Sequence, residues 1–445
     1  MESSMHKYFR KEVGSPVPSS RSSRLASMAG LAAGIAGNVA SEYAKQLSHG
    51  NTPTLKDVLL TPSNAKRVAN KLKKMRGAAL KVGQLLSMDS GEFIPPELAA
   101  ILEKLRDNVD PMPFSQLTML LNKEWGENWH ENFKQFSFTP MAAASIGQVH
   151  SAHNNSNERL AIKIQYPGVS KSIDSDVENV GTILKYSGLL PDATKIEGLL
   201  NETKQQLHSE TDYFSEASWI EKYRLALADD DTFIVPRVYN EFTKNNILCM
   251  SFHEGKNIDS FTALPQQERN HIVSSLISLT FREIFEFGYV QTDPNFANYL
   301  YQSGSKKIVL LDFGATRKLP QHISTGYQQL LNASVNNNKL AMNNAISEIG
   351  FFQDDISEKQ KDAVIELFQM ACEPLQHIGE YDFSNSGLAK KISMAGRDLS
   401  FKKNYWHTPP ADALFLHRKI AGLYLIAAKL NAKINIQNLI NPYIN

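Results

Sequence analysis

Apolar and polar residues alternate in the middle of this chain and recur at helical spacing on either side of it. In residues 136–166 the alternation has a period of two and is interrupted by a turn-forming run at 154–157, which predicts antiparallel strands. Apolar runs at 233–236 and 247–250 are expected to be two more strands. The pattern therefore predicts a small sheet of about five strands.

Helical periodicity precedes and follows these strands. Before them, apolar residues in 68–86 recur at alternating spacings of four and three, and Lys81 and Gln84 lie on a neighbouring stripe. Behind Pro167 an acid-rich helical region is expected to extend to about residue 228, with an interruption at Pro191. The second half is expected to be helical, with amphipathic helices over 270–287, 327–334, 339–348, 358–373 and 411–430.

The start of the chain differs in composition from the rest. Residues 1–24 are expected to be disordered. Their serine and arginine content is typical of an organelle-targeting segment, but two glutamates and two prolines weigh against a transit peptide. Residues 25–41 carry no charge and contain Gly30 and Gly34 at the spacing that allows close helix contact in lipid. Because a membrane span needs about 20 apolar residues, a membrane helix and a small-residue helix packed on the protein both fit this segment.

These patterns divide the 445 residues into five parts, expected at 1–24, 25–44, 45–134, 135–253 and 254–445. The net charge of +1 gives no general attraction to nucleic acid, and no nucleic-acid partner is expected. Cys249 and Cys372 each lie in an apolar run, so both are expected to be buried thiols. No disulfide framework or zinc site can be built from two such residues.

Two carboxylates and a carboxamide stand at fixed separations around one apolar run, 308–311, which is expected to be a strand that ends at Asp312. Asn298 follows Asp293 by five residues, which matches the Asp-x4-Asn spacing of a kinase catalytic loop. Asp312, in Asp-Phe-Gly, follows the apolar run directly. Phosphoryl transfer needs an acid that orients the nucleophile, here Asp293, and an Asp and an Asn that hold Mg²⁺. The alternative is an ordinary loop carboxylate and a turn-capping aspartate.

A lysine and several acids could complete a nucleotide site. Lys163 lies in the alternating apolar strand, where an inward lysine is costly unless it is paired. We therefore expect ATP phosphates and a carboxylate beside it, with Glu216 as the partner; the alternative is an edge lysine that faces water. Asp212 and Glu216 are four residues apart and are expected to share a helix face, with Glu210 roughly opposite, so the acids could serve two different bases.

Together these features predict an α+β, bilobal protein-kinase-like fold, with a small antiparallel sheet lobe, a helical lobe and an α-helical N-terminal extension. ATP is expected between the lobes. Its adenine is expected to meet backbone groups of Met250, Ser251, Phe252 and His253.

The chain departs from ordinary protein kinases in three respects. Gln-Thr-Asp replaces His-Arg-Asp before the catalytic loop. No Ala-Pro-Glu follows Asp-Phe-Gly, so the loop that docks a peptide substrate is expected to be missing or very short. Alanine is less free to adopt positive φ than glycine. A stiff phosphate-covering loop is therefore expected where the chain has Ala142, Ala143, Ala144 and Ser145.

This set of motifs resembles the UbiB family of atypical kinases, most closely its mitochondrial members needed for coenzyme Q (ubiquinone) biosynthesis. The resemblance covers roughly residues 16–435 and implies that Lys81 and Gln84 belong to an extension folded over the cleft, with Lys81 contacting Glu210 and blocking where a protein substrate would bind. Family members usually carry an acidic residue where this chain has Ser251. The shared motifs are Lys81-Val-Gly83-Gln84, Ala142-Ala-Ala-Ser145, Glu210-x-Asp212, Gln291-Thr-Asp293-Pro-Asn-x-x-Asn298 and Asp312-Phe-Gly314.

The resemblance implies ATP hydrolysis, or phosphorylation of a lipid or small molecule, with ATP and Mg²⁺ as cofactors. It also implies anionic membrane lipid and the quinone-biosynthesis enzymes as partners, on the matrix side of the mitochondrial inner membrane. A homodimer through residues 25–44 is a further expectation. The alternative function is a non-catalytic nucleotide-binding scaffold, which the alanine loop and an occluding Lys81 would favour. Aminoglycoside-kinase-like phosphotransfer would leave Lys81 and Gln84 without a role.

Overall fold

The computed structural model describes residues 111–144, 146–186, 196–352, 356–397 and 410–444, together with residues 37, 41, 43, 45, 48 and 81. The predictions for 1–24 and for almost all of 25–110 therefore lie outside the described residues. The chain forms two compact units. We call them the sheet unit, Met1–Ser218 with Arg237–Phe252, and the helical unit, Trp219–Pro236 with His253–Asn445.

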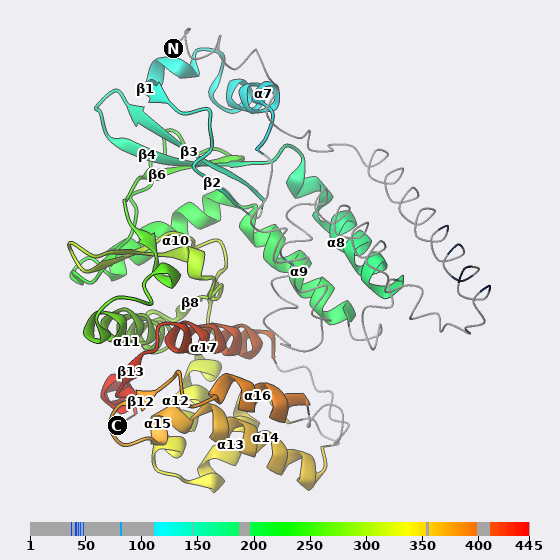
Figure 1. Cartoon of the computed structure of the whole chain (residues 1–445), viewed down its shortest axis with the longest axis vertical. Helices are drawn as coiled ribbons and strands as arrows, with labels where there is room; N and C mark the ends of the chain where they lie inside the picture. The colour runs from blue at the N-terminus through cyan, green and yellow to red at the C-terminus, as the bar shows by residue number, and fades with distance from the viewer. Residues whose placement is uncertain are drawn as a thin grey trace. The chain divides into compact units, whose positions relative to one another are not determined.

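The sheet unit contains a five-stranded antiparallel sheet (Figure 1), which confirms the predicted number of strands. The strand order is β1-β3-β4-β6, and β2 pairs with the first residues of β3. Along β3 and β4 buried and less buried positions alternate, as the period of two predicted. The strands are β1 (Phe133–Phe136), β2 (Ala142–Ala143), β3 (Gly147–Asn154), β4 (Arg159–Gln165) and β6 (Ile247–Ser251).

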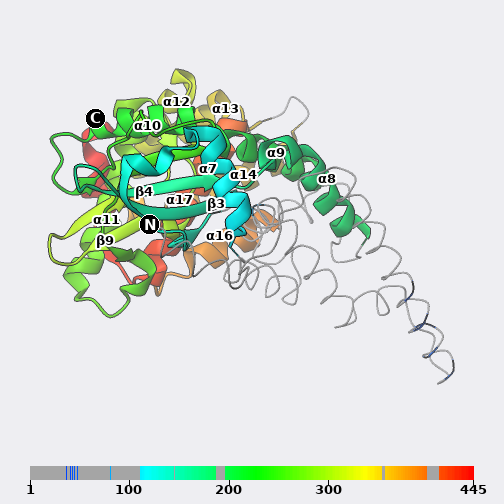
Figure 2. The ribbon, with the colours of Figure 1, turned by 90° about the horizontal axis from the view of Figure 1, so that it is seen from above.

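The core of the sheet unit lies between this sheet and helix α7 (Phe114–Trp125), which packs on one sheet face (Figure 2). Leu117 and Leu121 of the helix join Leu160 and Ile162 of β4 in one buried apolar cluster. A short 3₁₀ helix, Trp129–Asn132, adds the buried ring of Trp129 to the same cluster. Burying these side chains supplies the main driving force for folding this unit.

Three helices lie between β4 and β5 in the sequence, not the two that Pro191 alone would have separated. They are α8 (Val169–Tyr186), α9 (Ile196–Glu210) and α10 (Tyr213–Ala226). Helices α8 and α9 pack side by side (Figures 1 and 2), and Gly181 allows this because a Cβ there would lie 2.3 Å from Leu200 Cδ1. Helix α10 begins in the sheet unit and ends in the helical unit.

The strand expected at 308–311 is present in the helical unit, but so are further strands, and the expectation of an otherwise helical second half is wrong. A four-stranded sheet has the order β5-β10-β9-β7, and β8 pairs with β11 in a separate ladder. The run predicted at 233–236 belongs here, because β5 pairs in parallel with β10 and not with the antiparallel sheet. The strands are β5 (Phe233–Ile234), β7 (Lys256–Asn257), β8 (Tyr289–Gln291), β9 (Tyr299–Gln302), β10 (Lys307–Leu310) and β11 (Thr316–Lys318).

The predicted amphipathic helices of this unit are all present. Their apolar faces form a cluster that includes Ile323, Leu330, Met342, Ile346 and Leu416. The helices are α11 (Gln266–Arg282), which continues as a π-helix (Glu283–Phe287), α12 (Gln321–Val335), α13 (Lys339–Ile349), α14 (Glu358–Ala371), α15 (Glu373–Gln376), α16 (Leu388–Arg397) and α17 (Ala411–Lys429). Strands β12 (Tyr381–Asp382) and β13 (Lys433–Ile434), helix α18 (Ile436–Ile440) and a 3₁₀ turn (Asn441–Tyr443) complete it.

The structure bears on the predictions for the two cysteines and for a membrane helix. Cys249 and Cys372 are both buried free thiols, as predicted. Among the described residues, none of the helices combines the length and the apolar character needed to cross a bilayer. The candidate membrane segment at 25–41 lies almost entirely outside those residues.

Candidate active site

The predicted catalytic loop, 292–298, is fixed at its start by the ladder between β8 and β11. Gln291 pairs with Thr316 in this ladder. The next residue, Thr292, then donates both its amide and its hydroxyl to Ala315 O, at 3.3 and 2.7 Å. The loop that begins with Asp293 is thereby attached to the segment that follows Asp-Phe-Gly.

Asp293 and Asn298 face each other across this loop. Asn298 Nδ2 donates to Asp293 O at 3.2 Å and to Asp293 Oδ2 at 3.3 Å. Asn298 is 7% exposed, and its carbonyl accepts from Leu311 N at 3.0 Å. A short 3₁₀ turn, Phe296–Asn298, sets this direction. The structure thus brings together the two loop residues and the end of the strand that leads to Asp312.

Asp312 lies two residues beyond β10. Its Oδ1 accepts from Gly314 N at 3.0 Å, so it does cap a turn. An ionised carboxylate offers about four acceptor sites, so capping this turn does not by itself conflict with the predicted metal role. Phe313 is 1% exposed and its ring centre lies 4.8 Å from that of Tyr223. Burial of Phe313 fixes the backbone beside the carboxylate.

The donor atoms of this loop suit Mg²⁺, which prefers carboxylate and carbonyl oxygens. The Asn298 amide nitrogen is directed at Asp293, which leaves its Oδ1 as the atom for a cation. In the described part of the chain, no three His, Cys, Asp or Glu side chains form a cluster that could hold a metal ion. An ion held by Asn298 and Asp312 would therefore also depend on phosphate and water oxygens, as is usual for Mg²⁺ in kinases.

In the sheet unit, Lys163 and Glu216 form the predicted pair. Lys163 Nζ donates to Glu216 Oε1 at 2.6 Å, and the two side chains are 12% and 3% exposed. Lys163 comes from the middle of β4 and Glu216 from the first turn of α10. A buried charge pair of this kind needs further hydrogen bonds or a charged ligand to offset its desolvation.

A second buried pair lies in the same unit. Lys81 Nζ is 2.5 Å from Glu210 Oε1, and both residues are at most 9% exposed. This is the contact that the family resemblance implied. Gly83 and Gln84, predicted to act beside Lys81, lie outside the described residues.

The prediction that Asp212 and Glu216 share one helix face is wrong. Helix α9 ends at Glu210 and α10 begins at Tyr213, so Asp212 stands between two helices. Asp212 Oδ1 accepts from Ser215 N at 3.0 Å, which is the bond of a helix N-cap. An Asp that can satisfy the free amides of a new helix favours a break there over one continuous helix.

The alanine-rich loop forms a hairpin at one edge of the sheet. Ala142 and Ala143 are the exposed strand β2, and Ala144 N donates to Gly147 O at 2.9 Å. Ser145 lies outside the described residues. Gly147, the first residue of β3, lies close against β4, because a Cβ there would lie 2.2 Å from Ile164 O.

In the segment predicted to contact adenine, the backbone amides of Ser251 and Phe252 are already hydrogen-bonded. Met250 and Ser251 end β6, and Ser251 N donates to Arg237 O at 2.9 Å. Phe252 N donates to Arg159 O at 2.9 Å. His253 begins the next part of the helical unit, and burial lowers the pKa of its imidazole. Adenine recognition through the amides of Ser251 or Phe252 would require these bonds to open.

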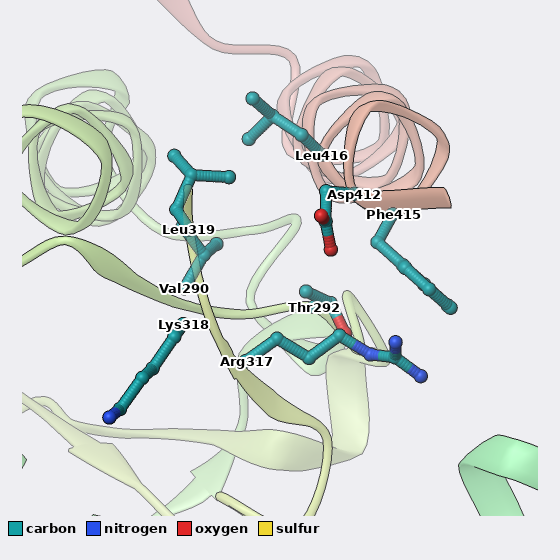
Figure 3. Close-up of a pocket in the computed structure, with 8 residues that line it drawn as sticks. All are labelled: Val290, Thr292, Arg317, Lys318, Leu319, Asp412, Phe415 and Leu416. Carbon is teal, nitrogen blue, oxygen red and sulfur yellow. The ribbon is translucent and has the colours of Figure 1, made fainter. Parts of the chain in front are cut away.

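A small pocket opens beside the catalytic loop in the helical unit. The guanidinium of Arg317 lies 3.7 Å from the centre of the Phe415 ring, and Asp412 also faces the pocket (Figure 3). Burial lowers the pKa of Arg317, and the charge of Asp412 opposes that change. The lining residues come from β8, β11, α17 and their immediate neighbours: Val290, Thr292, Arg317, Lys318, Leu319, Asp412, Phe415 and Leu416.

Three residues that the sequence patterns did not indicate lie beside Gln291, which leads into the catalytic loop: Tyr223, Glu283 and Lys419. Glu283 is 0% exposed and Lys419 is 2% exposed, although both are charged residue types. Each interrupts an apolar stretch of a predicted helix, and a charge at such a position is a signal for a buried partner. The sequence contains no indication of which partner that is.

Comparison with known proteins identifies the family. A family model described as "ABC1 atypical kinase-like domain" matches residues 104–346, more than half of the chain. The chain belongs to the ABC1 atypical kinase family. The resemblance to UbiB-type atypical kinases drawn from the motifs is therefore confirmed, and the protein is an ATP-dependent phosphotransferase or ATPase of the atypical kinase type.

Curated relatives match over nearly the whole chain. The protein named "Atypical kinase COQ8, mitochondrial" of Saccharomyces cerevisiae is 38% identical over 96% of this chain and 85% of its own length. "Atypical kinase COQ8B, mitochondrial" of Rattus norvegicus is 37% identical over 95% of this chain and 80% of its own length. These names support a mitochondrial location for this ABC1 kinase.

Among solved structures, the Mycobacterium tuberculosis protein Rv3197, solved in complex with erythromycin, has a TM-score of 0.60 and 24% identity. The match covers 86% of this chain and 96% of that one. It shows a shared fold, and together with the family match it confirms the predicted bilobal kinase-like architecture.

Proposed function

We propose that this ABC1 kinase binds Mg-ATP and transfers its γ-phosphoryl group to water, a lipid or a small molecule, in support of coenzyme Q (ubiquinone) biosynthesis. The observation that carries the catalytic part is the contact between Asn298 and Asp293, at 3.2 and 3.3 Å, on a loop bonded to the strand before Asp312. The biosynthetic part rests on the relatives named COQ8.

In the sheet unit, Lys163 would hold the α- and β-phosphates, with Glu216 fixing its direction. A lysine already 2.6 Å from a buried carboxylate has its ammonium in one place before the nucleotide arrives, which supports this role. The hairpin of Ala142, Ala143 and Ala144, with Ser145, would cover the phosphates. Backbone groups between Met250 and His253 would meet the adenine, and the amides of Ser251 and Phe252 would take part only if their present bonds open.

In the helical unit, Asp293 would orient the attacking hydroxyl or water, and Asn298 and Asp312 would hold Mg²⁺. A bound Mg²⁺ neutralises negative charge that develops on the phosphate oxygens. The protein's own part is to keep the Asp293 carboxylate in position. The bond from Asn298 Nδ2 to Asp293 supports that positioning, because it restricts rotation of the Asp293 side chain.

Two features favour a small or lipid acceptor over a peptide. Strand β11 starts at Thr316 and α12 at Gln321, so little chain is available after Asp312 to dock a peptide. The buried pair of Lys81 and Glu210 supports the proposal that the N-terminal extension is held against the sheet unit. With Gly83 and Gln84, Lys81 would then exclude protein substrates.

The partners we propose follow the family resemblance. Anionic membrane lipid fits the basic run at 66–81, which holds seven basic residues and no acid. The quinone-biosynthesis enzymes, the matrix side of the inner membrane and a homodimer through residues 25–44 complete the proposal. A vesicle-binding experiment with and without anionic lipid tests the first of these partners.

The experiment that tests the catalytic proposal compares Asp312→Asn with the matched control Asp382→Asn. Both aspartates cap turns through side-chain oxygens, but Asp382 lies at the β12 turn, away from the loop. Phosphate release from purified full-length protein and quinone synthesis in cells should both be lost only in the Asp312 variant. Quinone synthesis that persists in Asp312→Asn while phosphate release is lost would favour the second candidate, a nucleotide-binding scaffold.

A further inference from the structure

A fully buried charge pair lies directly behind the catalytic loop. Glu283 Oε1 accepts from Tyr223 OH at 2.6 Å and from the backbone amide of Gln291 at 3.2 Å. Lys419 Nζ lies 3.6 Å from Glu283 Oε2 and donates to Gln291 Oε1 at 3.3 Å and to Tyr299 OH at 3.1 Å. Both the backbone and the side chain of Gln291 are therefore held, two residues before Asp293.

The pair depends on local features of two helices. Glu283 is the first residue of the π-helix that follows α11, and such wider turns are often found at functional sites. Lys419 lies in the middle of α17. In the family match, residues 104–346 are covered, so the helix that supplies Lys419 is not part of the matched domain.

A single face of α17 contacts the catalytic loop and the strand after Asp-Phe-Gly. Phe415 stacks against the guanidinium of Arg317, 3.7 Å away. Gly422 lies against the loop itself, because a Cβ there would be 2.2 Å from Pro294 Cβ. Lys419 stands between them at spacings of four and three residues, so all three project from one side of the helix.

Attraction between the two side chains offsets part of the cost of burying them. Burial lowers the pKa of the Lys419 ammonium, but attraction to Glu283 and Tyr299 outweighs burial, and the pKa is raised. Burial also raises the pKa of the Glu283 carboxyl, against the opposing effect of Lys419. Glu283 Oε2 has no hydrogen-bond partner in the described part of the chain, so the charge of Lys419 is what compensates it.

We propose that Lys419 is a positioning residue for phosphoryl transfer: with Glu283 it fixes Gln291, and through Gln291 it fixes the direction of the Asp293 carboxylate. This inference rests on the proposed role of Asp293. The closely packed Gly422 keeps α17 near enough to the loop for Lys419 to reach Gln291.

The test is steady-state ATP hydrolysis by the full-length protein with Lys419→Met, and with Lys391→Met as the matched control. Lys391 lies on α16 in the same unit, but its side chain is 50% exposed and pairs with Glu373 at the surface. We expect kcat to fall by about tenfold to a hundredfold, the cost of misplacing a catalytic group by about 1 Å, with KM for ATP unchanged within about twofold. The control should match wild type.

Two further variants separate positioning from folding. Lys419→Met combined with Glu283→Gln removes the buried uncompensated charge while keeping an acceptor for Tyr223, so it should fold and still show the low kcat. Gly422→Ala should lower kcat without any change of charge, and Gly198→Ala, in open space on α9, should not. A folded double variant with wild-type kcat, or a loss that falls on KM alone, overturns the proposal.

Asp293→Asn, measured in parallel, distinguishes failure of the role proposed for Asp293 from failure of the positioning role proposed for Lys419. If Asp293→Asn keeps the wild-type kcat, the role proposed for the loop fails. If it abolishes hydrolysis and the Lys419 variants do not change kcat, only the positioning role fails.

Discussion

The ammonium of Lys163 lies 2.6 Å from the carboxylate of Glu216, and both side chains are almost completely buried. One partner comes from a sheet strand and the other from the first turn of a helix that begins after the Asp212 cap. The position at which α10 begins therefore determines where Glu216 holds Lys163, the residue that we assign to the phosphates.

Glu216→Gln should weaken ATP binding. The variant keeps the shape of the side chain but removes the charge that directs Lys163, and we expect the Kd for ATP to rise about tenfold, roughly 1.4 kcal/mol. Glu221→Gln is the control, since Glu221 pairs with Arg224 at the protein surface. Titration with a fluorescent ATP analogue measures both. Equal affinities in the two variants would contradict the phosphate role of Lys163.

Asp212→Ala should destabilise the protein by about 1 kcal/mol, because it removes the acceptor for Ser215 N at the start of α10. Asp212→Asn should stay close to wild type, since Asn is as good an N-cap as Asp. Urea unfolding of the three proteins tests this. An Asn variant as unstable as the Ala variant would show that the charge, and not the cap, is required.

Gly147→Ala should destabilise the sheet unit. The new Cβ would lie 2.2 Å from the backbone oxygen of Ile164, which cannot rotate away, so we expect a loss of about 1–3 kcal/mol. Gly198→Ala lies in open space on a helix and should be neutral or stabilising by up to about 1 kcal/mol. Thermal unfolding midpoints distinguish them, and a wild-type midpoint for Gly147→Ala would count against the close contact.

Acid should destabilise the helical unit through His417. Burial lowers the pKa of this imidazole from 6.5 to about 4. Between those pH values the unfolded chain binds more protons than the folded one, so the free energy of unfolding falls as pH drops from 6.5 towards 4. At pH 5 the loss from this group is about 2 kcal/mol. His417→Asn should reduce the difference between urea midpoints at pH 7 and pH 5.

The control for this pH dependence is His322→Asn. His322 is exposed on α12 in the same unit, so its replacement should leave the difference between the two midpoints unchanged. An unchanged difference in His417→Asn would mean that another group causes the acid sensitivity. His150 is the first to consider, because burial also lowers its pKa to about 4.

The features that the sequence predicted well are local in the chain. Strand alternation, the Asp293–Asn298 spacing and the helices after Pro320 depend on neighbours within a few residues, and the structure contains each of them. The pairing of Lys163 with Glu216, 53 residues apart, was predicted because an inward lysine requires a carboxylate and a kinase-like arrangement supplies it from a helix.

The features that were missed depend on contacts between distant segments. Strand β5 is two residues long and pairs in parallel with β10, so its own pattern could not identify its sheet. Lys419 and Gln291 are 128 residues apart, and nothing in either local pattern relates them. The helix break at Asp212 was overlooked because an Asp also occurs within helices, and its capping role depends on the backbone that follows.

The ladder between β8 and β11 has only three residue pairs, Thr316 with Gln291, Arg317 with Val290 and Lys318 with Tyr289. It nevertheless ties the residues that lead into Asp293 to those that come out of Asp-Phe-Gly, and the Thr292 bonds to Ala315 extend it. A motion that carried one loop away would have to break the ladder or carry the other loop along. Opening and closing of this half of the site should therefore be a single concerted step, with one rate constant for both loops.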